Sequence, residues 1–497
     1  MALTEGGVMT VKTEDAARAG TPAARTSRRG PTPATGEQLS RADRVARGKD
    51  ARAQASLESH AEFTPDASRD PVALLLEQEK SRVSELVPVR HGRMLVSPFT
   101  FFRGAALPMA ADLATTPTSG LRVQLCGDAH LSNFGAFASP SRRLVFDVND
   151  FDETLPGPFE WDVKRLAASL AVAGRDNGFG GKDRRKIVLA GVQSYRTAMQ
   201  EFAAQSFLTV WYAHLDVEDT IARFQSQMPK KALKATEKVV AKAHTHDSMQ
   251  ALSKLATQAG GQWRIISDPP LIEPVEEVFP GAQASAIQKM VRGMLGRYQR
   301  TLQSDRKYLL QHFTLARVAR KVVGVGSVGT RCWIALLDAG DGTEPLFLQT
   351  KEAQVSVLAR YCGHSQYASQ GERVVAGQHL MQAESDIFLG WTRATDPDGA
   401  ARDYYVRQLK DWKFSAPIEQ MNPASMASYA GLCGWTLARA HARTGDRIAL
   451  AAYLGGSSKF DQAIAGFAEK YADQNERDYA ALQAAVKDGR AETTTDI

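Results

Sequence analysis

Residues 125–162 read LCGDAHLSNFGAFASPSRRLVFDVNDFDETLPGPFEWD and place polar side chains around short apolar runs. Two such runs, LRVQLC and RRLVF, have the length and composition of short buried strands. The polar residues at the ends of these runs are Asp128, Asn133, Asp147, Asp150, Asp152 and Asp162. Carboxylates and amides supply the oxygen ligands that hard cations require. We therefore expect metal and phosphate chemistry in this part of the chain.

Three of these residues have a defined chemical use at this spacing. Asp128 begins a loop and can accept a proton from an attacking hydroxyl, whereas Asn133, five residues later, can offer its amide oxygen to magnesium. Asp150 follows the second apolar run and would complete the metal site. An acidic surface turn without function is the plainer interpretation of any single aspartate. The combination of GDxHxxN with DxxDFD favours a site.

The segments GDAHLSNFG, VNDFDE and WDVKRLA resemble a known set of motifs. They are similar to the HGDxHxxN, IDF and DLA pattern of the aminoglycoside phosphotransferase and choline kinase branch of the protein-kinase-like superfamily. From about residue 61 onward the chain resembles, more closely, a bacterial conserved-domain family that is assigned to that superfamily and has no established function. This resemblance implies that Asp128 is the catalytic base, Asn133 and Asp150 bind magnesium, and Asp162 steadies the catalytic loop.

One residue of the motif differs from the family pattern, and the identity of the metal-binding carboxylate stays open. Cys126 stands where the family has a histidine, which puts the internal anchoring of the loop in doubt. The spacing also leaves more than one candidate for the metal-binding carboxylate: it favours Asp147 or Asp150 equally, with Asp152 as the third possibility.

The residues that would hold nucleotide phosphates occur downstream, in KVVGVGSVGTRCWIALLDAGDGTEPLFLQTKEA. Gly324, Gly326, Ser327 and Gly329 lie between two apolar runs, and a third run ends on Lys351. Glycines let the backbone approach a triphosphate, and a lysine one strand away can neutralise its charge. A GxGxxG motif alone is equally typical of a tight hairpin. The lysine on the next strand favours the phosphate-binding interpretation.

This order is the reverse of that in kinases, where the glycine-rich loop precedes the catalytic loop. We therefore expect a circularly permuted, protein-kinase-like two-lobe fold of the α+β class with an expanded helical lobe. The segment YAGLCGWTLARAHARTGD resembles the LARLHA helix that leads into the catalytic loop of phosphotransferases, so the cut would fall between that helix and the loop. His441, within this helix, is expected to pack rather than to act in catalysis.

Two further segments would complete the smaller lobe. GERVVAGQHLMQAESD reads as a helix that carries Glu372, the expected ion-pair partner of Lys351, with Glu384 as the alternative. RDYYVRQLKDWKF has the alternation of a strand and is expected to border the adenine. The residues expected near the adenine are Tyr405, Arg407 and Gln408.

The chain divides into four parts on these criteria. Residues 1–60 are rich in Ala, Arg, Thr, Gly and Pro and are expected to form a disordered basic tail, for which a solvated state is favoured over contact with nucleic acid. Residues 61–315 would hold the catalytic loop, the metal site and the helical expansion. Residues 316–415 would form the small lobe, and residues 416–497 would return to the large lobe as helices.

Two basic features each have a functional and a plain interpretation. The lysine-rich segment PKKALKATEKVVAKAHTH either lines an acceptor site for an anionic substrate or is a solvated helix face. Arg103, in the segment FFRG, either braces the acidic site or is a plain surface arginine beside two buried phenylalanines.

The composition agrees with an intracellular enzyme. The chain has 497 residues, a net charge of +6 and four cysteines without a CxxC pair, which argues against a zinc site and a disulfide framework. Reduced thiols indicate a cytoplasmic location. No apolar run of about eighteen residues occurs and the N-terminus lacks an apolar signal core, so we expect neither a membrane span nor export.

Taken together, the resemblance implies an enzyme that uses ATP and magnesium to transfer a phosphoryl group. The acceptor is left open, with a small molecule favoured over a protein. Two alternatives remain: a kinase-like enzyme that transfers AMP, and a nucleotide-binding pseudokinase without chemistry.

Overall fold

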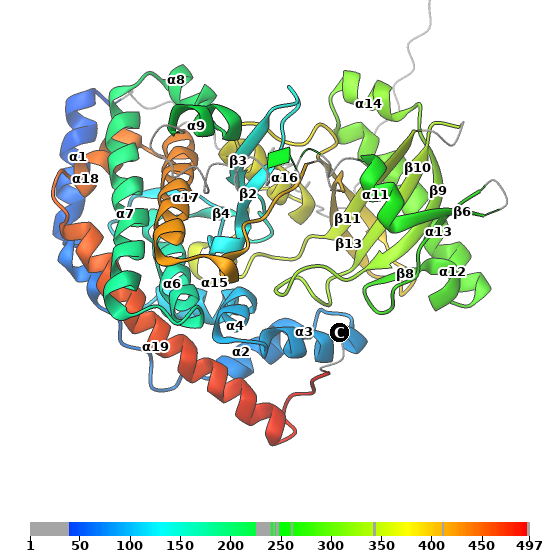
Figure 1. The fold of residues 1–497 in the computed structure, drawn as a ribbon, viewed down its shortest axis with the longest axis horizontal. Coiled ribbons are helices and arrows are strands. Elements are labelled where there is room, and N and C mark those ends of the chain that lie inside the picture. Colours follow the sequence, from blue (N-terminus) through cyan, green and yellow to red (C-terminus); the bar gives the residue numbers. More distant parts are fainter. Residues whose placement is uncertain are drawn as a thin grey trace, which may run out of the picture. The chain divides into compact units, whose positions relative to one another are not determined.

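The computed structural model describes residues 39–224, 240–241, 244, 248–259, 262–340, 344–409 and 412–494. The fold is mixed, with long helices and several antiparallel sheets (Figure 1). The expected α+β class is therefore confirmed.

The largest sheet has six strands in the order β12-β13-β11-β10-β9-β8, and each neighbouring pair is antiparallel. Successive residues of a strand point to opposite faces, and β10 follows this rule. Trp333, Ala335 and Leu337 belong to one apolar cluster, whereas Ile334 and Leu336 belong to another. The strands are β8 Ile272–Pro274, β9 Thr314–Lys321, β10 Cys332–Asp338, β11 Pro345–Glu352, β12 Gly390–Thr395 and β13 Ala401–Gln408.

Helices cover both faces of this sheet. Helix α13 (Gly281–Tyr298) contributes Ile287 and Val291 to the cluster that contains Trp333. Helix α11 (Ser248–Leu255) contributes Leu252 and Leu255 to the cluster on the other side. With both faces covered, every residue of β11, including Lys351, is buried.

Three smaller sheets hold the other strands of the described residues. In the first, β1 (Arg122–Leu125) pairs with β4 (Leu155–Pro158). In the second, β3 (Leu144–Val148) pairs with β2 (Phe134–Ala138) and β5 (Leu215–Asp216), and in the third β6 (Ala256–Ala259) pairs with β7 (Gln262–Ile265). The connection from β1 to β2 carries Asp128 and Asn133, and the loop from β3 to β4 carries Asp150 and Asp152. Asp147 lies within β3 and Asp162 within α6.

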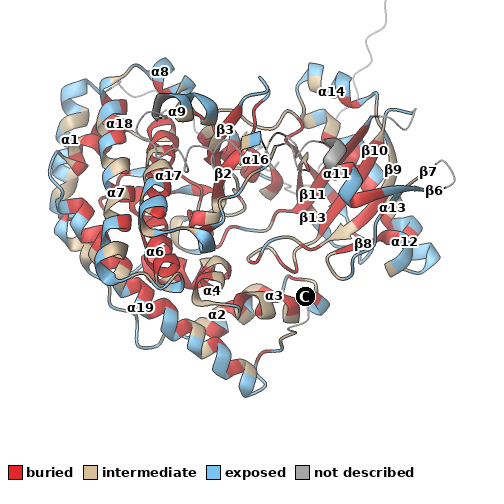
Figure 2. Cartoon of the chain, in the orientation of Figure 1, coloured by how far each residue is buried: buried red, intermediate tan, exposed pale blue. Residues whose placement is uncertain are grey.

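The helical part is built around α6 (Phe159–Asp176), which is buried along most of its length (Figure 2). Helices α7 (Gly181–Ala204), α17 (Pro423–Thr444) and α19 (Lys459–Lys487) pack around it. The remaining α-helices are α1 Arg41–Gln54, α2 Pro71–Glu79, α3 Val87–Met94, α4 Pro98–Gly104, α5 Ala106–Leu113, α8 Phe207–Tyr212, α9 Val217–Phe224, α12 Val275–Val278, α14 Ser304–Leu310, α15 Ala359–Cys362, α16 Gln370–Met381 and α18 Arg447–Leu454. Short 3-10 helices occupy Glu58–Ala61, Ser84–Leu86, Leu131–Asn133, Gln299–Thr301 and Ile418–Gln420.

The N-terminal segment differs from the expected disordered tail. Residues 41–54 form α1, which starts with a capping box between Ser40 and Asp43 and packs against α18. Gly48 makes this packing close, since a Cβ atom there would lie 2.1 Å from the carbonyl oxygen of Ala449. The prediction of disorder up to residue 60 was therefore wrong for this part, because composition alone does not reveal a small-residue contact with a distant helix. Residues 1–38 lie outside the described residues.

Two further segments form regular structure. Residues 217–224, VEDTIARF, form helix α9. The segment before α13 contains strand β8 and helix α12. Most of the lysine-rich segment PKKALKATEKVVAKAHTH lies outside the described residues.

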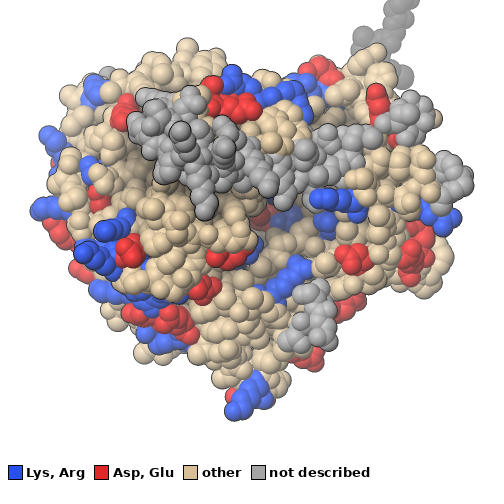
Figure 3. All heavy atoms as spheres, in the orientation of Figure 1, with Lys and Arg blue, Asp and Glu red and all other residues tan. Residues whose placement is uncertain are grey.

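Three further observations concern the surface, the thiols and the length of the helices. Over the described residues on the face drawn in Figure 3, Lys and Arg side chains are interspersed with Asp and Glu side chains. All four cysteines are free thiols. Among the helices that the structure describes, none combines the length and apolar character needed to cross a bilayer.

Candidate functional site

Two adjoining cavities are lined by several of the polar residues singled out in the sequence, among them Asp128, Asn133, Asp150, Asp152 and Lys351. We call them the Asp128 cavity, of about 770 Å³, and the Lys351 cavity, of about 400 Å³. The Asp128 cavity is also lined by residues of α2 and of the segment that follows β11, whereas the Lys351 cavity is lined by the end of β13. The residues that line both cavities are Arg103, Asn133, Asp150, Gly324 and Ser327. These shared residues mark the junction of the two cavities.

Asp128 lies in the loop after β1. Its carboxylate accepts a hydrogen bond from Nε of Arg165, at 2.8 Å, and pairs with a terminal nitrogen of the same guanidinium at 2.7 Å. Burial raises the pKa of Asp128 to about 6, although Arg165 acts in the opposite direction. A carboxylate with this pKa is ionised at neutral pH and is a stronger base than an ordinary aspartate.

Asp162, on α6, anchors this loop. Its carboxylate accepts hydrogen bonds from the backbone N–H groups of Cys126, at 2.8 Å, and Gly127, at 3.1 Å. Nε2 of His441, from α17, lies 3.2 Å from the same carboxylate. The loop is thus anchored through the backbone N–H groups of Cys126 and Gly127. His441 is fully buried, in agreement with the packing role expected for it.

Asn133 and Asp150 face the junction between the cavities. Nδ2 of Asn133 donates to the carbonyl oxygen of Asp128 at 2.7 Å, which leaves the Oδ1 atom of that amide as the candidate ligand for a cation. Burial opposes ionisation of Asp150, but the positive charges of Lys351 and Arg407 outweigh it and lower the pKa of this carboxyl. The described residues contain no group of three His, Cys, Asp or Glu side chains that could hold a metal alone. One carboxylate and one amide suit magnesium, which usually keeps water and phosphate oxygens among its ligands.

Lys351 reaches the same junction from β11. Its ammonium donates to Oγ of Ser327 at 2.6 Å, forms an ion pair with Asp152 and lies 4.0 Å from Asp150. Burial opposes the charged form, but Asp150 and Asp152 outweigh it and raise the pKa of Lys351. The hydroxyl of Tyr405 donates to Asp152 at 2.8 Å. Asp152 is therefore the main partner of Lys351 in this structure.

The expected ion pair between Lys351 and Glu372 is absent from the described residues, and so is the alternative pair with Glu384. The backbone N–H of Glu372 donates to Ser369 at the start of α16, and the Glu384 carboxylate accepts from Ser141 at 3.4 Å. The next residue of α16, Arg373, faces the site instead. Its guanidinium donates to the carbonyl oxygens of Thr154, Asp152 and Gln354 at 2.7–2.8 Å. The sequence pattern predicts the helix but not which of its faces meets β11. The prediction of Glu372 was wrong because the face that meets the site carries Arg373.

Asp147 is also corrected as a metal ligand. Its carboxylate is buried and pairs with Arg439 at 2.5 Å, and it accepts from the backbone N–H of Ala383 at 3.1 Å. Asp147 lines neither cavity. Asp147 lies near the end of β3 and pairs with an arginine of α17, so its role in this structure is to join β3 to α17.

The glycine-rich loop joins β9 to β10, and its residues line both cavities. Gly324 and Gly329 adopt positive φ angles of 65° and 87°, a conformation that favours glycine. Residues 83–93 hold the loop through two hydrogen bonds. Arg93 donates to the carbonyl oxygen of Gly324 at 2.6 Å, and the backbone N–H of Val83 donates to the carbonyl oxygen of Gly329 at 2.8 Å. Gly324, Gly326 and Ser327 line the cavities, whereas Gly329 packs against Arg82.

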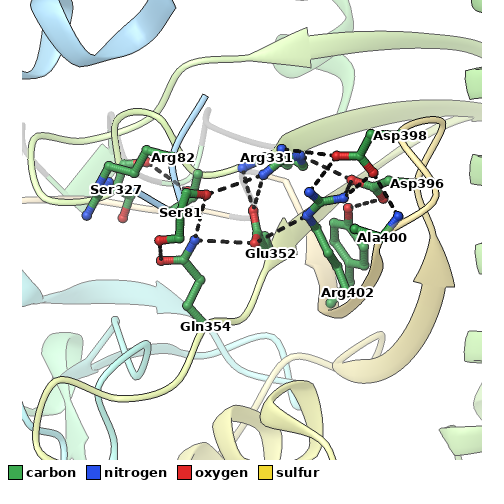
Figure 4. A network of polar contacts seen from close by, with 12 residues as sticks. Ser81, Arg82, Ser327, Arg331, Glu352, Gln354, Asp396, Asp398, Ala400 and Arg402 are labelled. Atoms are coloured by element: carbon green, nitrogen blue, oxygen red, sulfur yellow. Dashed lines mark hydrogen bonds and ion pairs between the residues drawn. The ribbon is translucent and has the colours of Figure 1, made fainter. Parts of the chain in front are cut away.

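A network of charged side chains fixes the base of this loop (Figure 4). Arg331, at the end of the loop, contacts Glu352 at 3.3 Å and Asp396 at 3.1 Å. Arg402 pairs with Asp396 and Asp398 at 2.8 and 2.6 Å. Because Glu352 directly follows Lys351, the network couples the position of the loop to that of the lysine strand.

Of the three residues expected near an adenine, two line the Lys351 cavity and one lines neither cavity. Arg407 and Gln408 line the Lys351 cavity, and the backbone N–H of Gln408 donates to Asp386 at 2.5 Å. Tyr405 lines neither cavity and instead contacts Asp152. Sequence reasoning missed three residues after β13 that also line the Lys351 cavity, which are Leu409, Lys413 and Ser415.

Arg165 was missed as well, although a signal for it exists. It follows Asp162 by three residues on α6, and residues three apart share one face of a helix. Asp162 binds the backbone of the loop and Arg165 binds the carboxylate of Asp128. One helix face thus orients the whole loop.

Comparison with known proteins identifies one family. A family model described as "Uncharacterized protein conserved in bacteria (DUF2252)" matches residues 82–485. No curated protein and no solved structure matches the chain.

Proposed function

The chain belongs to the bacterial conserved family DUF2252, and we propose that it is an ATP- and magnesium-dependent phosphotransferase with a circularly permuted protein-kinase-like fold. One observation carries the proposal: Lys351 pairs with Asp152, 199 residues earlier in the chain, at the junction where Asn133 and Asp150 also lie. Phosphoryl transfer needs a lysine, metal-binding oxygens and a base around one phosphate, and these residues are of those types.

The order of elements in the large sheet supports the proposal. The glycine-rich loop joins β9 to β10, the lysine lies on the next strand, β11, and helix α16 follows before β12 and β13. Kinases likewise place a glycine-rich loop, a strand with the lysine and a helix in this succession.

The contacts of α17 support the permutation. Gly445, just after this helix, packs so closely on the β1 strand that a Cβ atom would lie 2.6 Å from Val123. The backbone N–H of Gln124 donates to the Thr444 hydroxyl at 3.2 Å. The end of the helix and the strand that leads to Asp128 are therefore neighbours in space, as a kinase chain without the cut would require.

In the proposed reaction, an acceptor hydroxyl in the Asp128 cavity gives its proton to Asp128 while its oxygen bonds to the γ-phosphorus of ATP. The bond from that phosphorus to the bridging oxygen breaks, and ADP leaves with the electron pair. Arg165 orients Asp128, and Lys351 neutralises phosphate charge from the other cavity. Magnesium, held by Asn133 and Asp150, would supply further neutralisation of the phosphates.

The acceptor proposed is a small molecule rather than a protein. The Asp128 cavity, of about 770 Å³, has the size of sites for small ligands. It is bounded by residues of α2, among them Glu77 and Gln78, and by the segment after β11 that includes Ser356 and Val357. These walls limit the space for an extended polypeptide.

Incubation of the purified protein with magnesium and ATP labelled at the α or the γ position tests the proposal. Transfer or hydrolytic release of the γ label alone is expected. Incorporation of the α label would instead identify AMP transfer. Nucleotide binding without turnover of either label, across a panel of hydroxyl acceptors and water, would identify a pseudokinase, and failure to bind ATP would refute a nucleotide site altogether.

A further inference from the structure

We propose that Arg103 binds the phosphoryl group during its transfer. This inference rests on the proposed phosphotransferase function and assigns a residue that the motifs do not include. Arg103 lies at the end of α4, upstream of the Asp128 loop, and its neighbours Phe101 and Phe102 are fully buried. These aromatic side chains fix the helix, so the guanidinium is presented from a rigid element.

The position of Arg103 carries the argument. It lines both the Asp128 cavity and the Lys351 cavity, together with Asn133, Asp150, Gly324 and Ser327. An acceptor in one cavity and a nucleotide in the other would meet at this junction. The group that passes between them is the phosphoryl group.

The guanidinium of Arg103 has a buried Nε atom without a hydrogen-bond partner among the described residues. Burial lowers the pKa of this arginine, and the facing charges are those of Asp128, Glu419 and Arg93. Asp128 already pairs with Arg165 at 2.7 Å. No described residue forms a hydrogen bond or ion pair with the terminal nitrogens of Arg103, so an anionic oxygen at the junction would supply the partners that this guanidinium lacks.

The neighbouring arginines are engaged elsewhere. Arg82 donates to the carbonyl oxygen of Val328, Arg90 pairs with Glu79 at 2.6 Å, and Arg165 pairs with Asp128. These three arginines hold the loops in place. Arg103 differs from them because it alone of the four lines both cavities.

An arginine suits this position for a chemical reason. Its planar guanidinium can donate two parallel hydrogen bonds to phosphoryl oxygens, and arginines in such positions stabilise the charge of the transition state. Lys351 approaches the junction from the sheet, whereas Arg103 approaches it from the helical segment. The two cations would therefore contact the phosphoryl group from different sides.

The glycine-rich loop is fitted to this arginine. A Cβ atom on Gly326 would lie 3.1 Å from the carbonyl oxygen of Arg103. A side chain at residue 326 would push the loop away from α4 and widen the junction. The loop and Arg103 are thus positioned together.

Binding of ADP with magnesium, in the presence or absence of fluoroaluminate, tests the inference without the natural acceptor. Fluoroaluminate mimics the phosphoryl group in transfer, and we expect it to tighten ADP binding by the wild-type protein, measured by calorimetry. Arg103→Gln should reduce this tightening by at least about tenfold while leaving the affinity for ADP alone within about threefold. Arg103→Lys should retain part of the tightening, because lysine keeps the positive charge but cannot donate the two parallel hydrogen bonds of a guanidinium.

Lys80→Gln is the matched control. It also removes one positive charge from the N-terminal segment, but Lys80 is exposed and lines neither cavity. Full tightening in Arg103→Gln, or wild-type protein that binds ADP without any effect of fluoroaluminate, would overturn the role of Arg103 alone. A wild-type protein that binds neither ADP nor ATP would overturn the proposed function itself. Equal melting temperatures of the variants exclude a folding defect.

Discussion

At the scale of single residues, Asp128 combines burial with a close positive charge. Arg165 approaches its carboxylate at 2.7 Å, yet burial still raises the pKa to about 6. Burial therefore dominates over the ion pair. The result is a carboxylate that is ionised at neutral pH and held in one orientation.

Replacement of this carboxylate gives the first prediction. Asp128→Asn should lower turnover by about 10²–10⁴-fold, because general base catalysis contributes on that scale. The affinity for ATP should stay nearly unchanged, since Asp128 does not line the Lys351 cavity. Steady-state kinetics and a direct ATP titration measure both values. Asp305→Asn, an exposed carboxylate of α14, is the control, and an Asp128→Asn variant with wild-type turnover would exclude this residue as the base.

The pH dependence of activity gives the second prediction. The base acts only when ionised, so kcat/KM should be full above the pKa of Asp128 and fall as the pH drops through about 6. Arg165→Gln should move the midpoint to higher pH, because it removes the positive charge that lowers this pKa. Rates measured from about pH 5 to about pH 8 test both statements. A profile that stays level through this range is incompatible with the assignment.

At the scale of elements, the orientation of α16 decides which side chain meets the site. Arg373 donates to three backbone carbonyl oxygens of neighbouring segments, whereas Glu372 does not reach Lys351. Neighbouring residues on a helix differ in direction by about 100°, so a shift of one residue exchanges one side chain for the other.

The two neighbouring residues of α16 give the third prediction. Arg373→Met should lower the free energy of unfolding by about 2–4 kcal/mol, because it leaves buried carbonyl oxygens without their donor. Glu372→Gln should change it by less than about 0.5 kcal/mol. Urea denaturation of both variants provides the comparison. Equal losses of stability would restore Glu372 as a partner of the site.

The contact between α7 and α17 gives the fourth prediction. Gly434 lies so close to α7 that a Cβ atom would be 2.0 Å from the carbonyl oxygen of Gly191. Gly434→Ala should therefore destabilise the protein by about 1–3 kcal/mol. Gly431→Ala on the same helix meets nothing within 4 Å and should stabilise it by about 0.5–1 kcal/mol, since alanine favours helix. Thermal denaturation measures both, and a harmless Gly434→Ala would mean that the helices are further apart.

At the scale of the whole molecule, the site joins segments that are remote in sequence. The Asp128 loop and the glycine-rich loop join strands of different sheets. Val83 and Arg93 contact the glycine-rich loop, and Phe102 accepts a hydrogen bond from Arg165, the partner of Asp128. A ligand that bridges the two cavities would therefore stabilise the assembly of these parts.

This arrangement gives the fifth prediction. ATP with magnesium should raise the melting temperature, since a ligand at a hundred times its dissociation constant contributes about 2.7 kcal/mol. Chelation of magnesium should remove most of the effect. In Lys351→Met and in Asp150→Asn the rise, taken relative to each variant without ligand, should be much smaller. An undiminished rise in both variants would place the nucleotide elsewhere.

Much of the local structure follows from the sequence by itself. The α+β class, the glycine-rich hairpin, the strand that ends near Lys351 and helices α7, α17 and α19 follow from hydrophobic periodicity and turn residues, which act over short distances. Membership of a bacterial conserved family likewise follows from residues that are read in order.

The pairing of side chains was decided only by the tertiary structure. Asp152 rather than Glu372 meets Lys351, Asp147 is held by Arg439, and Arg103 enters the junction between the cavities. The same holds for α1, which packs against α18. Each of these outcomes depends on the rotation and spacing of elements that lie far apart in the chain. Local periodicity specifies which face of an element is apolar, but it does not specify which distant side chain that element will meet.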